Sequence, residues 1–168
     1  MLIRLPTGQR VLIRQIRPSD KSLLKAGLAR LSAETIRRRF LSPKPTLSSG
    51  ELRYLTEIDG ENHVAYVALL ADVPRETLIA VGRYVATAED PRTAEVAVVV
   101  GDEFQGHGLG TRLGLALADH ARTVGIQRFS ASMLSDNAPA HRLFARISQR
   151  LSSERQTGVD TLIADLAA

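Results

Sequence analysis

The strongest constraint on the fold of this chain is a glycine-rich segment in its second half. Residues 101–114 read GDEFQGHGLGTRLG, with five glycines in fourteen residues. The preceding AEVAVVV is typical of a strand, and the following LGLALADHARTV is typical of an amphipathic helix. Glycine loses more freedom than any other residue when it is ordered. This density therefore indicates a backbone that must adopt left-handed angles or approach a ligand closely.

Two common phosphate-binding loops do not fit the segment. A Walker loop needs a Lys after its last glycine, and no Lys lies between Gly101 and Gly114. The dinucleotide fingerprint fails because Thr111 or Leu113 stands where its third glycine is required. The segment still joins a strand to a helix N-terminus, whose free N–H groups suit an anionic oxygen. It predicts either a diphosphate cradle or a turn without a ligand.

Size and composition narrow the class of protein. With 168 residues, 44% of them hydrophobic, we expect a single globular domain over residues 1–168. The absence of cysteine excludes disulfides, a cysteine nucleophile and thiolate metal sites, and four scattered histidines show no metal-ligand spacing. We therefore predict no metal.

The charge points to anionic partners without choosing among them. The net charge is +4, which favours phosphates, nucleic acid or acidic surfaces. An aromatic content of 4% argues against nucleic acid bound by stacking. No apolar run reaches the length of a membrane span, and the first residues show no signal peptide, so we expect a cytoplasmic protein, a monomer or a homodimer.

Periodicity and capping residues predict the order of elements. We expect a strand over 10–16, a helix after Pro18, a short helix capped by Ser32 and ending at Phe40, and a helix opened by the capping box of Ser48 and Glu51. Three strands at 63–70, 78–86 and 94–100, separated by turns with proline, predict an antiparallel meander. After the glycine segment we expect a helix ending at Gly125, a strand over 128–133 and a helix over 138–147.

The predicted fold class is α/β (α+β), with a mixed, mostly antiparallel sheet flanked by helices, and not a doubly wound parallel sheet. The tail, 149–155 and 159–166, fits either a closing hairpin or a terminal helix.

The run Gln105-Gly106-His107-Gly108-Leu109-Gly110 resembles the acetyl-CoA signature of the GNAT superfamily of N-acetyltransferases, Q/R-x-x-G-x-G/A. His107 stands where the family often has Arg. VLIRQIRPSD and LARLSAETIRRRF resemble the catalytic domain of bacterial Pat-type protein lysine acetyltransferases, so that the resemblance covers roughly residues 11–147. It implies a GNAT fold and transfer of an acetyl group from acetyl-CoA to an amine. Protein lysine is the favoured acceptor, and a small-molecule amine is the alternative.

The resemblance also implies cofactor-binding residues. Pantetheine would lie against the backbone of the strand before the glycines, where an N–H near Val98 would stabilise the thioester oxyanion. The diphosphate would contact the backbone of the loop. Asn137 would bond to the cofactor, although a helix cap explains this residue equally. The predicted residues are Val98, Val99, Val100, Gln105, Gly106, His107, Gly108, Leu109, Gly110, Thr111 and Asn137.

A catalytic base follows from the chemistry of the amine. A lysine with a pKa near ~10.4 is protonated and cannot attack until it loses that proton. The resemblance implies Glu95 as this base, directly or through a water, because its AEV context is where lysine-modifying members of the family place theirs; the alternative is a surface carboxylate at a strand end. The family often has a Tyr acid where this chain has Phe144, so water would protonate a leaving thiol of pKa near ~8.5.

Other residues carry weaker indications. Asp102 and Glu103 are expected to face solvent. His63 and Tyr66 open the second predicted strand, 63–70, near the family's acceptor groove, but a structural His is the commoner case. Arg37, Arg38 and Arg39 fit either a 3′-phosphate contact or a solvated helix face. His120 is expected to be a buried, hydrogen-bonded core residue.

Two other functions remain open at this point. Phe144 and the altered tail are compatible with a CoA-binding regulatory module without turnover. The basic charge and the arginine run are compatible with a nucleic-acid-binding domain.

Overall fold

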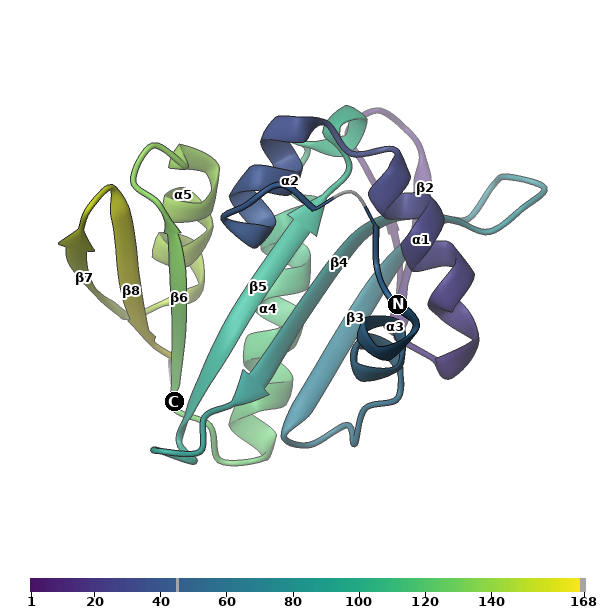
Figure 1. The fold of residues 1–168 in the computed structure, drawn as a ribbon. Coiled ribbons are helices and arrows are strands. Elements are labelled where there is room, and N and C mark those ends of the chain that lie inside the picture. The colour runs from purple at the N-terminus through teal and green to yellow at the C-terminus, as the bar shows by residue number, and fades with distance from the viewer. Residues whose placement is uncertain (45, 167–168) are drawn as a thin grey trace.

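A short parallel contact in the middle of an otherwise antiparallel sheet organises the fold (Figure 1). The computed structural model describes residues 1–44 and 46–166. Two short 3-10 turns lie at Pro18–Asp20 and Asp102–Phe104. The helices are α1 (Lys21–Ala29), α2 (Ala33–Phe40), α3 (Ser49–Thr56), α4 (Leu109–Thr123) and α5 (Ala138–Ile147). The strands are β1 (Leu2–Arg4), β2 (Arg10–Gln15), β3 (His63–Leu70), β4 (Thr77–Ala86), β5 (Thr93–Val100), β6 (Arg128–Leu134), β7 (Arg150–Gln156) and β8 (Val159–Asp165).

The strands form one sheet in the order β1-β2-β3-β4-β5-β6-β8-β7. Every neighbouring pair is antiparallel except β5 and β6. The mixed, mostly antiparallel sheet predicted from the sequence is therefore confirmed, as is the meander β3-β4-β5. The tail forms the hairpin β7-β8, so the alternative prediction of a terminal helix is wrong. The alternating apolar residues of β8 pack onto the core beside β6. The three-residue β1 was not predicted.

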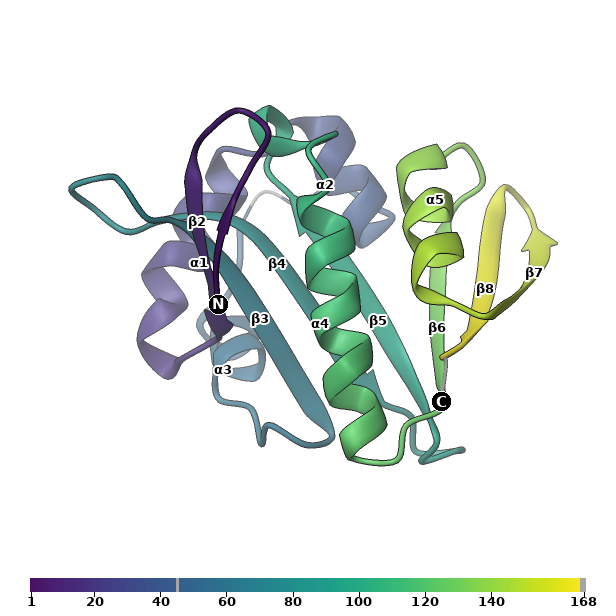
Figure 2. The same cartoon turned by 180° about the vertical axis from the view of Figure 1, so that it is seen from behind.

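Helices cover both faces of the sheet. Helices α1, α2 and α3 lie on the face turned to the viewer in Figure 1, whereas α4 and α5 lie on the other face, in front in Figure 2. The core is divided in the same way. Buried residues of α4 and α5 pack with Val96 and Phe129, whereas Leu24 and Leu52 pack with Val81 on the opposite face. No helix in the described ranges is long and apolar enough to cross a bilayer.

The contact between β5 and β6 ends early. Only Thr93, Ala94 and Glu95 pair with β6, opposite Arg128, Phe129 and Ser130. Beyond these residues the two strands diverge, as Figure 1 shows, and β6 continues its pairing with β8 alone. Helix α2 lies across the divergent ends and contacts both strands. The C-terminal half of β5 thus has a strand partner on one side only.

A buried ion pair fixes the start of α1 against β2. Arg14 donates to both carboxylate oxygens of Asp20, at 2.7 and 2.9 Å, and the backbone N–H of Arg17 donates to the same carboxylate at 2.8 Å. Asp20 is 2% exposed. Burial alone would raise the pKa of Asp20, but these hydrogen bonds and the charge of Arg14 hold it below its usual range.

We predict that Asp20→Asn lowers the free energy of unfolding by about 3 kcal/mol, because it leaves a largely buried guanidinium with only the exposed Glu76, 3.8 Å away, as a counter-ion. The matched control is Asp72→Asn, since Asp72 pairs with Arg10 at a site where both side chains are about half exposed. Water solvates both groups of that pair in either state, so its loss should cost much less. Urea unfolding at pH 7 measures both variants. If the two variants lost the same free energy of unfolding, burial would not make the Arg14–Asp20 pair more important for stability than the exposed Arg10–Asp72 pair.

Candidate active site

The divergence of β5 from β6 leaves backbone groups of β5 without a strand partner. Hydrogen bonds from Thr87 N to Thr93 O and from Gly101 N to Ile79 O lie at the two ends of the β4–β5 ladder. Because alternate residues of an antiparallel pair form these bonds, Val99 turns its N–H and C=O towards β4, and Val98 turns its own towards the gap. An N–H in this position is free to donate to a bound carbonyl.

The glycine segment folds into a loop whose N–H groups face the same gap. Gly106 and Gly108 have φ angles of +78° and +80°, in the left-handed region that other residues rarely adopt. Gly108 is the N-cap of α4, so the first N–H groups of that helix have no intrahelical acceptor. A Cβ at either glycine would meet no protein atom within 4 Å. The space beside the loop is therefore open to a ligand.

Polar contacts fix this loop against α2. Gln105 Nε2 donates to the carbonyl of Val100 at 2.9 Å and to Thr35 Oγ1 at 3.2 Å. The Asp102 carboxylate accepts from Ser32 N, Ser32 Oγ and Thr35 Oγ1 at 2.9, 2.6 and 2.8 Å. Although burial opposes ionisation, these bonds lower the pKa of Asp102. Asp102 is exposed, as expected, but it also connects β5 to α2, a role that its place in the sequence did not indicate.

These elements surround a cavity of about 420 Å³, here called the notch cavity, which lies within the size range of ligand sites. Its walls are the free side of β5, the glycine loop, α2 and α5. The lining residues include Thr35, Arg38, Arg39, Val98, Val99, Val100, Gln105, Gly106, Gly108, Leu109, Gly110, Thr111, Asn137, Ala140, Arg142 and Arg146.

The structure brings together the residues predicted to bind a cofactor, with one exception. His107 is half-buried and does not line the notch cavity, although its neighbours on both sides do. Leu109 is 1% exposed and packs in the core, so that only its backbone is available to a ligand. Asn137 lines the cavity and also caps α5, since its Oδ1 accepts from Ala140 N at 3.3 Å. Both interpretations of Asn137 are therefore compatible with the structure.

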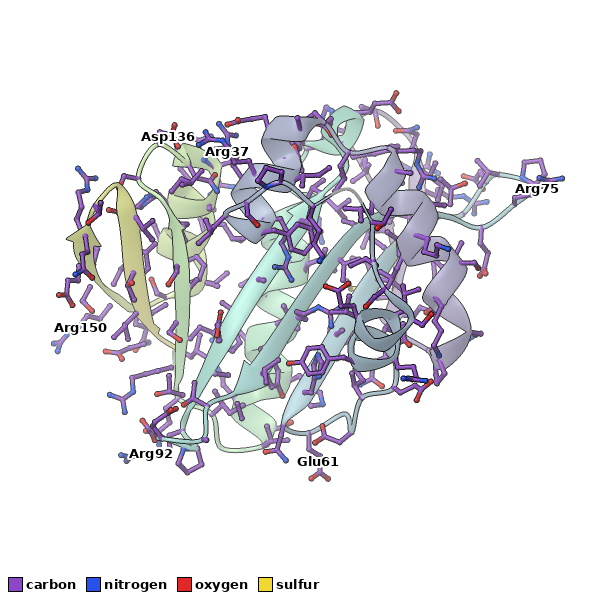
Figure 3. All side chains as sticks on the ribbon, viewed as in Figure 1. Arg37, Glu61, Arg75, Arg92, Asp136 and Arg150 are labelled. Atoms are coloured by element: carbon purple, nitrogen blue, oxygen red, sulfur yellow. The ribbon has the colours of Figure 1, made fainter. Side chains whose placement is uncertain are left out.

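Arginines give the notch cavity a positive charge. Arg38 and Arg39 of α2 face Arg142 and Arg146 of α5 across it. The pair on α5 was not predicted from the sequence, although its i, i+4 spacing after the helix cap was a usable signal. Arg37 does not line the cavity. Its side chain points to Asp136 at the top of the gap between α2 and α5 (Figure 3), with Nη2 3.8 Å from a carboxylate oxygen.

Glu95 lies at the point where β5 and β6 separate. It is exposed, and in the β5 alternation it shares a face with Ala97 and Val99, the face covered by α1, α2 and α3. The negative charge of Glu95 acts on Arg39. Phe144, considered above in place of a Tyr acid, has no ionisable group, and its side chain is 4% exposed and packs in the core.

A second cavity adjoins the first on this face. It measures about 310 Å³ and lies between α1, α2 and α3 and the strands β4 and β5. We call it the arginine cavity, because its mainly apolar walls include Arg39 and Arg83. It shares the lining residues Arg39, Val99 and Phe104 with the notch cavity, so the two cavities adjoin at these residues.

Arg83 connects the arginine cavity to His63. Its Nη1 donates to the carbonyl of Leu55 at 3.2 Å and lies 3.0 Å from His63 Nε2, which is therefore the acceptor of a neutral ring. Burial and the charge of Arg83 lower the pKa of His63 to about 4. Tyr66 packs on the opposite face, against the core beneath α4, and does not reach this cavity. His120 is half-buried and not fully buried as expected, but the expected hydrogen bond is present, since its Nδ1 lies 2.9 Å from the Tyr84 hydroxyl.

Comparison with known proteins supports one family. A family model described as the acetyltransferase (GNAT) family matches residues 31–148. The chain is 36% identical over 146 residues to acetyltransferase Pat of Mycolicibacterium smegmatis, covering 86% of this chain and 43% of that relative. It is 33% identical over 135 residues to acetyltransferase PA5475 of Pseudomonas aeruginosa, covering 80% and 72%. The chain thus spans less than half the length of the mycobacterial relative.

A solved structure agrees with this similarity. The crystal structure of the GNAT domain of S. lividans PAT superposes with a TM-score of 0.86 at 28% identity, covering 99% of this chain and 96% of that one.

The pKa of His63 predicts an acid-sensitive stability. Its value of about 4 in the folded chain lies below the 6.5 of an unperturbed histidine, so the unfolded chain takes up the proton first as the pH falls. We expect the free energy of unfolding to decrease from pH 7 to pH 5. His63→Asn still offers Arg83 an oxygen acceptor but does not titrate, and it should lose less stability over this interval. Urea titrations at pH 7 and pH 5 compare the wild type with this variant. Identical losses of stability in the two proteins would show that His63 is not the source of the pH dependence.

Proposed function

The chain belongs to the GNAT family of acetyltransferases, and from this we propose that it transfers the acetyl group of acetyl-CoA to an amine. The family and the fold expected from the glycine signature are confirmed. The observation that supports the activity most directly is the notch cavity. It combines a free N–H of β5, an open glycine loop at a helix N-terminus and cationic walls, in a volume of about 420 Å³.

Coenzyme A fits the chemistry of these walls. Its diphosphate would accept from the first N–H groups of α4, next to the partial positive charge of the helix. Arg38, Arg142 and Arg146 would neutralise the phosphates, the 3′-phosphate included. Of the three arginines considered for this role, Arg37 does not line the cavity and pairs with Glu34 and Asp136, whereas Arg38, which also pairs with Glu34, and Arg39 line it. When bound, the cofactor would supply the acetyl thioester.

The chain's own residues would then assist acyl transfer in two ways. The Val98 N–H would donate to the thioester carbonyl and stabilise the negative charge that develops on its oxygen. Glu95 would accept a proton from the ammonium, so that the neutral amine can attack the thioester carbonyl. Glu95 is three residues along β5 from Val98, about 10 Å at strand spacing, so a water would carry the proton part of the way. The leaving thiolate would be protonated through water, which takes the second proton of the nitrogen as the amide forms, since Phe144 has no proton to give.

A protein lysine is the acceptor class that we favour. The similarity to an acetyltransferase named Pat supports this choice, and so does the exposed position of Glu95, which a long lysine side chain could approach from solvent. A small-molecule amine would use the same chemistry. That residues 1–168 act as one catalytic domain is part of this proposal.

The test is Glu95→Gln, assayed by thiol release with acetyl-CoA and a panel of amines that includes lysine peptides. We expect turnover to fall by about 100-fold or more, which is the usual contribution of a general base. Calorimetric affinity for CoA should be unchanged, because Glu95 does not line the notch cavity. The matched control is Glu154→Gln, an exposed residue on β7, which should retain full activity.

Two results would contradict the proposal. Full activity in Glu95→Gln would remove Glu95 from the role of base. A wild-type protein that binds CoA but acetylates no amine of the panel would instead be the regulatory module without turnover.

A further inference from the structure

The arginine cavity holds two guanidinium groups without an acidic partner. Arg83 of β4 is 6% exposed, and Arg39 of α2 is half-buried. Within residues 1–44 and 46–166, no carboxylate lies within ion-pair distance of either. Arg14, by contrast, is a largely buried arginine with a bidentate carboxylate partner. A charged group that is buried without a counter-ion is costly for a folded chain.

The geometry leaves donors of Arg83 available to a ligand. Both of its hydrogen bonds within the described chain involve Nη1, which leaves Nε and Nη2 for another acceptor. Arg39 lies over the ring of Phe40, 4.9 Å from its centre, which orients the guanidinium beside the cavity. Burial, together with the charge of Arg39, lowers the pKa of Arg83 to about 10. An anion between the two groups would relieve this repulsion.

The acidic residues around the cavity do not supply that anion. Asp102 lines it, but its carboxylate accepts from Ser32 and Thr35. Glu103 lines it from an exposed position on the 3-10 turn. Glu95 influences Arg39 through its charge without forming an ion pair. The described residues therefore place no carboxylate against the free donors of Arg83.

The free donors of Arg83 lie next to the proposed base. Arg83 stands directly opposite Ala97 in the β4–β5 register, and Glu95 is two residues from Ala97 on the same face. Two residues of a strand span about 7 Å. A molecule whose ammonium group meets Glu95 would thus hold its remaining atoms towards the apolar walls formed by Leu55, Val81 and Val99. Its anionic group, if it has one, would reach the two arginines.

We propose that the acceptor carries a carboxylate close to its reacting amine, and that Arg39 and Arg83 bind this carboxylate in the arginine cavity. The proposal rests on the proposed acetyltransferase function and specifies its substrate class. The carboxylate would come either from the acceptor amino acid itself or from an acidic side chain beside an acceptor lysine. Arg39 and Arg83 are specificity residues in this scheme, because they hold the acceptor and take no part in proton transfer.

The experiment uses two matched pairs of acceptors, with the full chain and CoA present. Nα-acetyl-lysine is compared with its amide, and the blocked peptide Gly-Lys-Asp-Gly with Gly-Lys-Asn-Gly. In each pair the amine is the same and only the carboxylate differs. NMR titration of the labelled protein gives the dissociation constants, and thiol release with acetyl-CoA gives kcat and KM. We expect the carboxylate member of at least one pair to bind about tenfold more tightly than its uncharged partner, with a correspondingly lower KM and little change in kcat. The pair that shows this difference identifies where the carboxylate of the acceptor comes from.

Three variants locate the effect. Arg83→Met and Arg39→Met should each reduce the ratio of the two dissociation constants within the responding pair from about ten towards one. Arg39 is half-buried on a surface helix, so this variant remains informative if Arg83→Met fails to fold. The control is Arg37→Met, two residues earlier on α2, whose side chain points to Asp136 (Figure 3) and lines neither cavity. It should keep the preference.

The outcomes separate this inference from the proposed function. Equal binding within both pairs would overturn the inference, and so would no binding by any of the four compounds. A carboxylate preference that survives in both Arg83→Met and Arg39→Met would also overturn it. Equal turnover within both pairs would do the same while leaving the acetyltransferase function intact. A carboxylate preference in binding without any thiol release would contradict the acetyltransferase function and retain the anion site.

Discussion

The early end of the β5–β6 pairing is the constraint on which the rest of the molecule depends. Only three residue pairs connect these strands, and every other neighbouring pair in the sheet is antiparallel. Backbone groups without a partner inside a protein are costly unless a ligand or water satisfies them. The divergence is kept open by packing on both sides. Helix α4 lies behind β5, the β7-β8 hairpin extends the sheet beyond β6, and α2 lies across the front (Figures 1 and 2).

The alternation of β5 divides the proposed chemistry between the two cavities. The backbone of Val98 faces the notch cavity, where a thioester would lie, whereas the side chains of Glu95, Ala97 and Val99 face the α1–α3 side. A donor and an acceptor could therefore approach the same short stretch of strand from different directions without competing for space. The contacts of Asp102 with α2 keep the two cavities in a fixed relation. An ordinary property of strands, their two-residue period, thus separates the two substrate positions.

The sequence predicted well whatever depends on local interactions. The Ser48 capping box and the Ser32 cap were both found, and the glycine loop lies where its spacing placed it. The sequence predicted poorly what depends on distant partners. The burial of Arg83 depends on α3 and β3, which no local pattern around residue 83 reveals. Tyr66 was grouped with His63 near an acceptor groove but packs on the opposite face, because a strand buried on both sides has no clear alternation. The hairpin could not be chosen over a helix, because β7 is exposed throughout and has no apolar period.

The most direct test of the central claim, that the left-handed glycine loop holds the diphosphate of coenzyme A, is calorimetric titration of Gly108→Ala with CoA. Gly158, in the β7–β8 turn, has a φ of +78°, almost the same as the +80° of Gly108, and neither Cβ would meet a protein atom within 4 Å. Alanine at either position should therefore lower the free energy of unfolding by a similar amount, about 1 kcal/mol. We predict that Gly108→Ala weakens CoA binding at least about tenfold while Gly158→Ala binds as the wild type does. Equal CoA affinity in the two variants would contradict the claim.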